Sequence, residues 1–156
     1  MRRIGVLAFT ALAACAAQSN EPIQMTHDAC APLALVSSAA TQLQLDGLAA
    51  GQAMWRDRGV PALGLRAGET LEVRFEDAAG PFHGLYDDSQ GVIYINNDLT
   101  DPQVLAIVIA HETGHAFGLP HVPKSERISV MNPGNLDTPP TAADQAEIVA
   151  RWGECN

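Results

Sequence analysis

Residues 111–121 read His-Glu-Thr-Gly-His-Ala-Phe-Gly-Leu-Pro-His, and their spacing predicts a helix that ends in a sharp turn. Residues four apart share one face of a helix, so His111 and His115 direct their rings toward a common point. Gly118 lets the chain leave the helix in the left-handed conformation, which other residues disfavour. The turn then carries His121 back toward the same point. The sequence therefore predicts three imidazoles gathered at the end of one helix.

Three neutral imidazole nitrogens form a ligand set for a catalytic zinc ion, because they leave a fourth tetrahedral position for water. Zinc lowers the pKa of such a water toward about 7. Glu112 follows the first histidine and is placed to accept the proton of this water and pass it to a leaving amine. The spacing His-Glu-x-x-His is a helical signal of zinc proteases. We therefore expect one catalytic Zn²⁺ on His111, His115 and His121, with Glu112 as the catalytic base.

The chain resembles the metzincin clan of zinc endopeptidases through five residues of this run: His111, Glu112, His115, Gly118 and His121. Members of the clan place a methionine turn beneath the metal, and Met131 lies ten residues after His121 in a Ser-Val-Met-Asn-Pro sequence. Within the clan the chain is most similar to a minimal, matrixin-like catalytic domain. The resemblance implies an α+β zincin fold with a small mixed twisted sheet, an antiparallel edge strand, a buried active-site helix, the Met-turn and a C-terminal helix.

The chain also departs from the better-known subfamilies. Val122 follows the third histidine, where those subfamilies carry a distinguishing Asp, Glu, Ser or Pro, so the subfamily stays open. Asn132 follows Met131, and the sequence therefore lacks the tyrosine that astacin-like and serralysin-like members use as a further zinc ligand. A site of three histidines with one open position is the simplest interpretation. The residues His83, Asp87 and Asp88 favour an acidic surface turn over the structural metal sites of matrixins.

The first 14 residues have the features of an export signal. Two arginines precede an apolar run over residues 4–14, which is too short to span a bilayer and suits a secretory signal peptide. The run ends in Leu-Ala-Ala-Cys, which resembles the lipobox of bacterial lipoproteins. In such proteins the cysteine is acylated and becomes the first mature residue. We therefore expect residues 1–14 to be removed, Cys15 to carry lipid and residues 15–21 to form a tether.

Ordinary cleavage after Ala-Cys-Ala or Cys-Ala-Ala is the competing interpretation of this segment. We favour lipidation because Cys15 falls where the motif requires it. Under either interpretation the protein is an exported bacterial protein, anchored by lipid at the cell envelope or otherwise secreted.

Two cysteines remain if Cys15 carries lipid. An even pair in an exported protein is most simply a disulfide, which would join Cys30 to Cys155 and tie the two ends of the domain together. The alternative is that Cys30 caps the zinc as an inhibitory thiolate, as a matrixin propeptide does. That alternative leaves Cys155 unpaired, and the propeptide sequence of the family is absent.

The charge balance argues against a nucleic-acid partner. The chain has 18 acidic and 9 basic residues and a net charge of −9. Removal of residues 1–14 takes away Arg2 and Arg3 and makes the balance more acidic, which a phosphate backbone would repel. Residues 22–156 have the size of a single domain with its own core. We expect a monomer that meets a peptide or protein substrate and touches a membrane only through the lipid on Cys15.

Hydrophobic patterns predict the other elements. An apolar stripe predicts a helix that begins at Asp46 and ends near Gly59. Strands are predicted at Leu33–Val36, Leu71–Phe75, Val92–Asn96 and, as the antiparallel edge strand, Phe82–Tyr86.

The helix that carries the histidines begins with Thr100 or Asp101 as its N-cap and Pro102 in its first turn. Residues 104–110 are apolar on nearly every side, which predicts a helix buried in the middle of the domain. Thr141 and Asp144 form a capping box that begins the last helix.

These features together favour an exported zinc-dependent endopeptidase that binds an extended substrate along the edge strand. The alternative function is a non-catalytic zinc-binding surface lipoprotein that recognises a protein partner. Glu112 argues against it, because a purely structural site gains little from a carboxylate beside an open metal position.

Overall fold

The computed structural model describes residues 22–78 and 82–155 of the 156-residue chain. The expected signal peptide over 1–14, the lipidation site Cys15 and the whole 15–21 tether lie outside the described residues. The described elements follow one another as β1 (Leu33–Val36), α1 (Gln42–Arg56), β2 (Glu69–Glu76), β3 (Gly84–Asp87), β4 (Val92–Asn96), α2 (Pro102–Ala116) and α3 (Ala142–Trp152). Among the described residues, no helix has the length and apolarity needed to cross a membrane.

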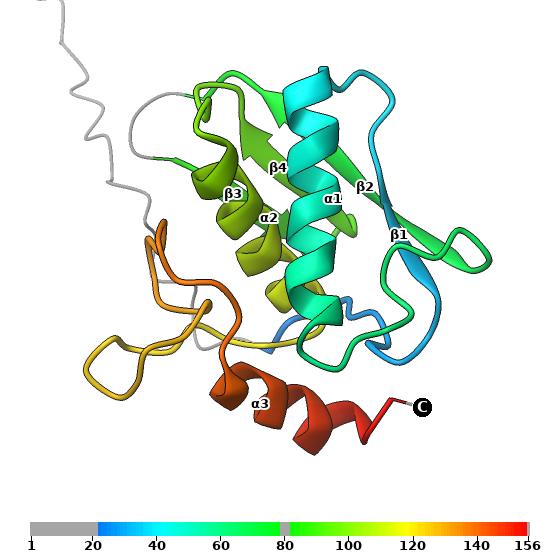
Figure 1. The fold of residues 1–156 in the computed structure, drawn as a ribbon, viewed down its shortest axis with the longest axis vertical. Coiled ribbons are helices and arrows are strands. Elements are labelled where there is room, and N and C mark those ends of the chain that lie inside the picture. Colours follow the sequence, from blue (N-terminus) through cyan, green and yellow to red (C-terminus); the bar gives the residue numbers. More distant parts are fainter. Residues whose placement is uncertain (1–21, 79–81, 156) are drawn as a thin grey trace, which may run out of the picture.

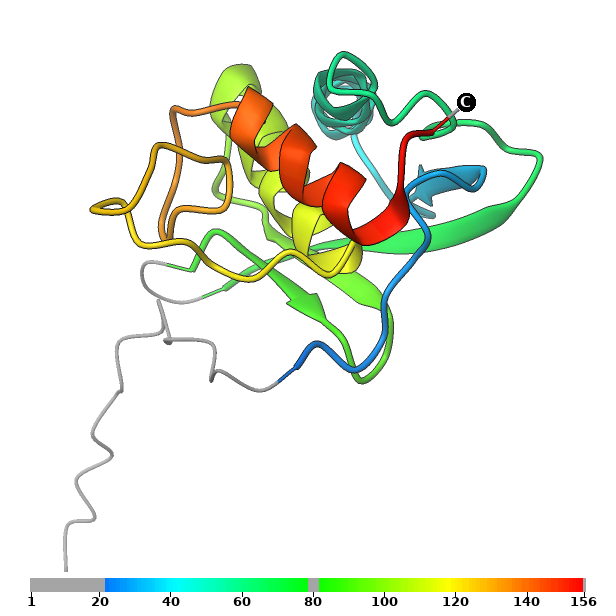
Figure 2. The same ribbon diagram turned by 90° about the horizontal axis from the view of Figure 1, so that it is seen from below.

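The strands form one mixed sheet in the order β1-β2-β4-β3. β1 and β4 are both parallel to β2, whereas β3 runs antiparallel to β4 at one edge. Both α1 and α2 lie on the same face of this sheet (Figure 1), and the view from below shows α3 beside the end of α2 (Figure 2). The predicted α+β class and the small mixed sheet with an antiparallel edge strand are confirmed.

β2 shows why the alternating pattern predicts its strand. Leu71 and Val73 are fully buried on the face that carries the helices. The intervening Glu72 and Arg74 pair with each other at 2.9 Å on the opposite face and stay partly exposed. Period-two alternation therefore identifies both the strand and its buried side.

The start of α1 differs from the prediction. The helix begins at Gln42, four residues before the expected Asp46. Thr41 Oγ1 accepts from Gln44 N at 3.3 Å, and Gln44 Oε1 accepts from Thr41 N at 2.8 Å. The prediction was wrong because it followed the apolar stripe, whereas this capping box satisfies the first amides and starts the helix earlier.

Two glycines bring α1 close to α2. A Cβ atom on Gly47 would lie 2.8 Å from the side chain of Leu105, and one on Gly51 would lie 3.0 Å from the carbonyl oxygen of Ala106. The fully buried Trp55 adds a hydrogen bond from its Nε1 to the carbonyl of Ala110 at 2.8 Å. α1 therefore holds α2 against the sheet at several points along its length.

Asp101, not Thr100, is the N-cap of α2. Its Oδ1 accepts from Gln103 N at 2.9 Å and from Val104 N at 3.0 Å, and Pro102 opens the first turn. Every residue from Leu105 to Ala116 is buried. The expectation of a helix buried on all sides is confirmed, and such a helix is a rigid mount for side chains.

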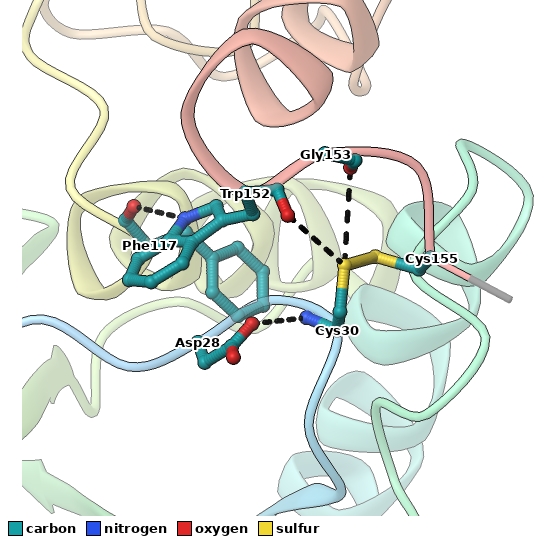
Figure 3. The surroundings of a disulfide bond; sticks show 6 residues. All are labelled: Asp28, Cys30, Phe117, Trp152, Gly153 and Cys155. Carbon is teal, nitrogen blue, oxygen red and sulfur yellow. Dashed lines mark hydrogen bonds between the residues drawn. A yellow bond between two sulfur atoms is a disulfide. The ribbon is translucent and has the colours of Figure 1, made fainter.

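α3 is fixed by side-chain hydrogen bonds at both of its ends. The predicted Thr141–Asp144 capping box is present at its start. Near its end, Trp152 Nε1 donates to the carbonyl of Phe117, just after α2, at 3.0 Å. Figure 3 shows this contact beside the disulfide between Cys30 and Cys155, which are 125 residues apart in the sequence.

The Cys30 sulfur also lies 3.9 Å from the carbonyl oxygens of Trp152 and Gly153 (Figure 3). A sulfur in a disulfide carries no proton, so these approaches are van der Waals contacts. The covalent bond is therefore what ties the amino-terminal segment to the end of α3.

Loss of this bond should lower the stability of the protein. The chain-entropy model assigns a loop of this length about 4 to 5 kcal/mol of unfolding free energy. We expect the double variant Cys30→Ala, Cys155→Ala to lose an amount of this order in urea unfolding. Addition of a reductant should destabilise the wild type and leave the double variant unchanged. Identical unfolding midpoints for the wild type with and without reductant would contradict the disulfide.

Candidate metal centre

Three histidines converge at the carboxyl end of α2. His111 and His115 project from the helix, and His121 comes from the segment that follows it. The Nε2 atoms of His111 and His121 are 3.0 Å apart, and each lies 3.2 Å from Nε2 of His115. His111 and His115 are buried, whereas His121 is partly exposed. The predicted cluster is thus assembled with one side open to solvent.

The partners of the other ring nitrogens fix the tautomers. His111 Nδ1 lies 2.6 Å from the carbonyl oxygen of Val130, and His115 Nδ1 lies 2.8 Å from that of Leu119. A carbonyl oxygen only accepts hydrogen bonds, so each Nδ1 carries its proton and each Nε2 presents a lone pair to the cluster. Facing lone pairs repel one another unless they share a cation.

The cluster has the dimensions of a metal site. Zinc–nitrogen bonds of about 2.0–2.1 Å in a tetrahedron place neighbouring nitrogens about 3.3 Å apart. The observed separations of 3.0 and 3.2 Å are close to this value. The three histidines can therefore hold a metal ion, and the donor set of three imidazoles fits zinc.

Gly118 builds the turn that connects the second ligand to the third. Its φ is 86°, in the left-handed region, and it donates to the carbonyl of His115 at 2.8 Å. Leu119 N donates to the carbonyl of Gly114 at 2.9 Å. This pair of bonds is a Schellman motif, which ends the helix and reverses the chain. The same turn aims the Leu119 carbonyl at His115.

The segment around Met131 holds the third ligand. Val122 N donates to the carbonyl of Met131 at 3.0 Å, and Asn132 Nδ2 donates to the carbonyl of Val122 at 2.9 Å. Met131 is fully buried. A Cβ atom on Gly114 would collide with its sulfur, so this methionine packs directly on α2 beside His115.

Burial keeps the histidines in the form that binds metals. It lowers the pKa of His111 to about 4, although the bond to Val130 opposes the shift. Burial likewise lowers the pKa of His115 well below its ordinary value and lowers that of His121. Imidazole binds a metal only when it is neutral, and these pKa shifts favour the neutral rings at pH 7.

The side chain of Glu112, the residue after His111, is also buried. Burial raises its pKa to about 8, while a hydrogen bond with the Tyr86 backbone opposes the shift. A Cβ atom on Gly84 would lie 2.8 Å from Glu112 Oε1. The edge strand β3 therefore runs directly against this carboxyl group, which places the sheet edge, the carboxyl and the histidine-bearing helix together.

No protein-family model matches the chain, and no curated protein matches it. The predicted site residues can still be placed from the structure alone. His111, His115 and His121 gather at the end of α2. Glu112 follows His111 on the same helix, with its carboxyl against Gly84 of β3, and Met131 packs against Gly114.

Cys30 does not take part in the cluster. It is bonded to Cys155, so the structure offers no free Cys30 thiol for the alternative of an inhibitory thiolate. Asp87 is the last residue of β3 and caps the surface turn that follows, because its Oδ1 accepts from Ser89 N at 3.0 Å and from Gln90 N at 3.2 Å.

A cavity of about 540 Å³ adjoins the third histidine. Its apolar wall includes Leu119, Val122, Met131 and Pro133, and its charged wall consists of Glu126, Arg127 and Glu147. Arg127 Nη1 pairs with Glu147 Oε1 at 3.2 Å. The cavity has room for an extended side chain beside His121.

Sequence reasoning missed three participants in the site. The carbonyl groups of Val130 and Leu119 leave no signal in the sequence, because every residue has a carbonyl. Gly84 did leave a signal in the sequence, since an isolated glycine in a strand pattern often marks a position where another group approaches the backbone closely. Here that group is the carboxyl of Glu112.

Proposed function

We propose that the protein is a zinc-dependent endopeptidase of the metzincin clan. The observation that supports this most strongly is the set of three inward-facing Nε2 atoms 3.0 to 3.2 Å apart. Glu112 follows the first of these histidines on α2 and is buried. A zinc ion, when bound there, lowers the pKa of a water molecule and polarises the scissile carbonyl. The chain resembles the minimal, matrixin-like members of the clan, and Met131 is its Met-turn residue.

Glu112 moves the proton in this proposal. Its carboxylate accepts a proton from the attacking water as the new C–O bond forms, and delivers it to the leaving amine as the C–N bond breaks. The buried setting holds the pKa of this group near 8 before the cation binds, and a nearby cation favours the charged carboxylate. The same side chain can therefore act as base and then as acid.

The edge strand supplies a surface for the substrate. Within the described residues β3 pairs on one side only, with β4, and its other side offers backbone amides and carbonyls. An extended peptide can add to such an edge as a further strand. Because Gly84 lies against Glu112, a peptide on this edge would pass beside the reacting groups. The cavity next to His121 would receive one of its side chains.

Export is part of the same proposal. Residues 1–14 would act as a signal peptide and Cys15 would carry lipid at the cell envelope. The disulfide between Cys30 and Cys155 supports this assignment, since such bonds persist in oxidising compartments.

The Glu112→Gln variant tests the mechanism. It retains the shape of the side chain and removes the base, so we expect it to bind zinc like the wild type and to lose about 10²- to 10⁴-fold in peptide cleavage. Cleavage is measured by mass spectrometry on a peptide library, with metal content measured in parallel. The control is Glu76→Gln at an exposed position of β2, which should cleave normally.

Cleavage by the zinc-loaded Glu112→Gln variant at the wild-type rate would refute this mechanism. A wild type that binds zinc and cleaves no peptide in the library would instead favour the non-catalytic zinc-binding lipoprotein.

The Gly84→Ala variant tests the contact between the edge strand and the base. The added Cβ would lie 2.8 to 2.9 Å from Glu112 and Val108 and should displace the carboxyl group. We expect kcat to fall about 10- to 100-fold, because small displacements of a catalytic group have large effects on rate. Zinc affinity should not change, since the three atoms nearest the added Cβ belong to Glu112 and Val108 and not to a histidine. Unchanged kcat would show that the edge strand does not position Glu112.

A further inference from the structure

The carboxyl group of Asp144 is buried at the start of α3, beyond the ligands described above. Asp144 has no exposed surface. Its Oδ2 accepts from Thr141 N and Thr141 Oγ1, both at 2.8 Å, and these two bonds belong to the cap of the helix. The same carboxyl also accepts from Ser129 Oγ and, at 3.1 Å, from Val130 N. Two of its four donors therefore come from the segment that carries Met131.

Capping a helix does not require this burial. Asp101 caps α2 through two backbone amides and remains exposed to solvent. A buried carboxylate loses its hydration, and charge-assisted hydrogen bonds from the protein must compensate for that loss. No salt bridge to Asp144 occurs in the described part of the chain. The carboxyl of Asp144 is therefore buried because it accepts hydrogen bonds from Ser129 and Val130 as well as from the helix cap.

Val130 connects this carboxyl group to the histidine cluster. Its amide donates to Asp144, and its carbonyl oxygen accepts from His111 Nδ1 at 2.6 Å. Asn135 Nδ2 donates to the same carbonyl oxygen at 3.1 Å. Val130 is fully buried, so water does not substitute for any of these partners. The position of its carbonyl therefore depends on where Asp144 holds its amide.

We propose that Asp144 is a positioning residue of the metal centre, which acts through Val130 to orient the His111 ring. The inference rests on the proposed function only in requiring that the histidines bind a metal. Groups that hold the outer nitrogen of a ligand histidine fix its orientation and its basicity. Asp144 acts indirectly: from α3 it holds the amide of Val130, and the carbonyl of Val130 holds Nδ1 of His111. The last helix of the fold is thereby coupled to the first histidine on α2.

The test compares zinc affinity in three variants. Asp144→Ala removes all four hydrogen bonds. Asp144→Asn retains an oxygen for Val130 and Thr141 but removes the charge. Thr141→Ala is the matched control, because it removes the N-cap side chain of α3 and leaves the bond between Asp144 and Val130 in place. Zinc dissociation constants are measured by competition with a chelator, and thermal unfolding of the metal-free proteins is measured beside them.

We expect Asp144→Ala to bind zinc about tenfold more weakly than the wild type, as for other outer partners of ligand histidines. The zinc affinity of Asp144→Asn should lie between those of Asp144→Ala and the wild type. Thr141→Ala should bind zinc as tightly as the wild type, despite a lower unfolding temperature. In the cobalt(II)-substituted proteins, the visible bands should shift in the Asp144 variants and not in Thr141→Ala.

Equal zinc affinities for the Asp144 variants and Thr141→Ala would overturn the proposal, because the effect would then follow helix stability alone. If Asp144→Ala does not fold, the comparison of Asp144→Asn with Thr141→Ala decides by the same criterion. A wild type that binds zinc but cleaves no peptide refutes the endopeptidase and leaves this comparison valid. A wild type that binds no zinc overturns both.

Discussion

Three imidazole Nε2 atoms held 3.0 to 3.2 Å apart are the constraint on which the arrangement of this protein depends. The Nε2 lone pairs of His111 and His115 face each other at 3.2 Å and repel, and both rings are buried. Backbone carbonyl oxygens accept hydrogen bonds from Nδ1 of His111 and Nδ1 of His115, so these two rings keep their Nε2 atoms directed into the cluster. A cation at the common point would remove this repulsion, so the three histidines could hold a metal ion.

The rest of the domain limits movement of these rings. α2 is buried from Leu105 to Ala116 and is held on the sheet by the close packing of α1. The turn at Gly118 and the pairing of Val122 with Met131 bring His121 back to the helix. α3 is fastened at its end by the disulfide between Cys30 and Cys155. Metal ligands tolerate little positional error, and this framework supplies the required rigidity.

Local sequence patterns predicted much of this architecture. The i, i+4 spacing of His111 and His115 and the turn at Gly118 depend on residues that are near in sequence. The same holds for the alternation in β2 and the capping box at Thr141. The prediction that α1 begins at Asp46 was wrong because a hydrophobic stripe indicates which residues are buried and does not indicate where the helix is capped. The contacts of Val130 with His111 and of Gly84 with Glu112 join residues at least 19 positions apart, and no local pattern specifies which backbone group meets which side chain.

X-ray absorption at the zinc edge of the metal-loaded protein measures the ligands around the metal. We expect three histidine nitrogens at about 2.0–2.1 Å and one further light-atom ligand supplied by solvent. It also predicts that the spectrum stays the same when Cys30 and Cys155 are both replaced by alanine. A sulfur ligand near about 2.3 Å, or fewer than three imidazoles around the metal, would contradict the account.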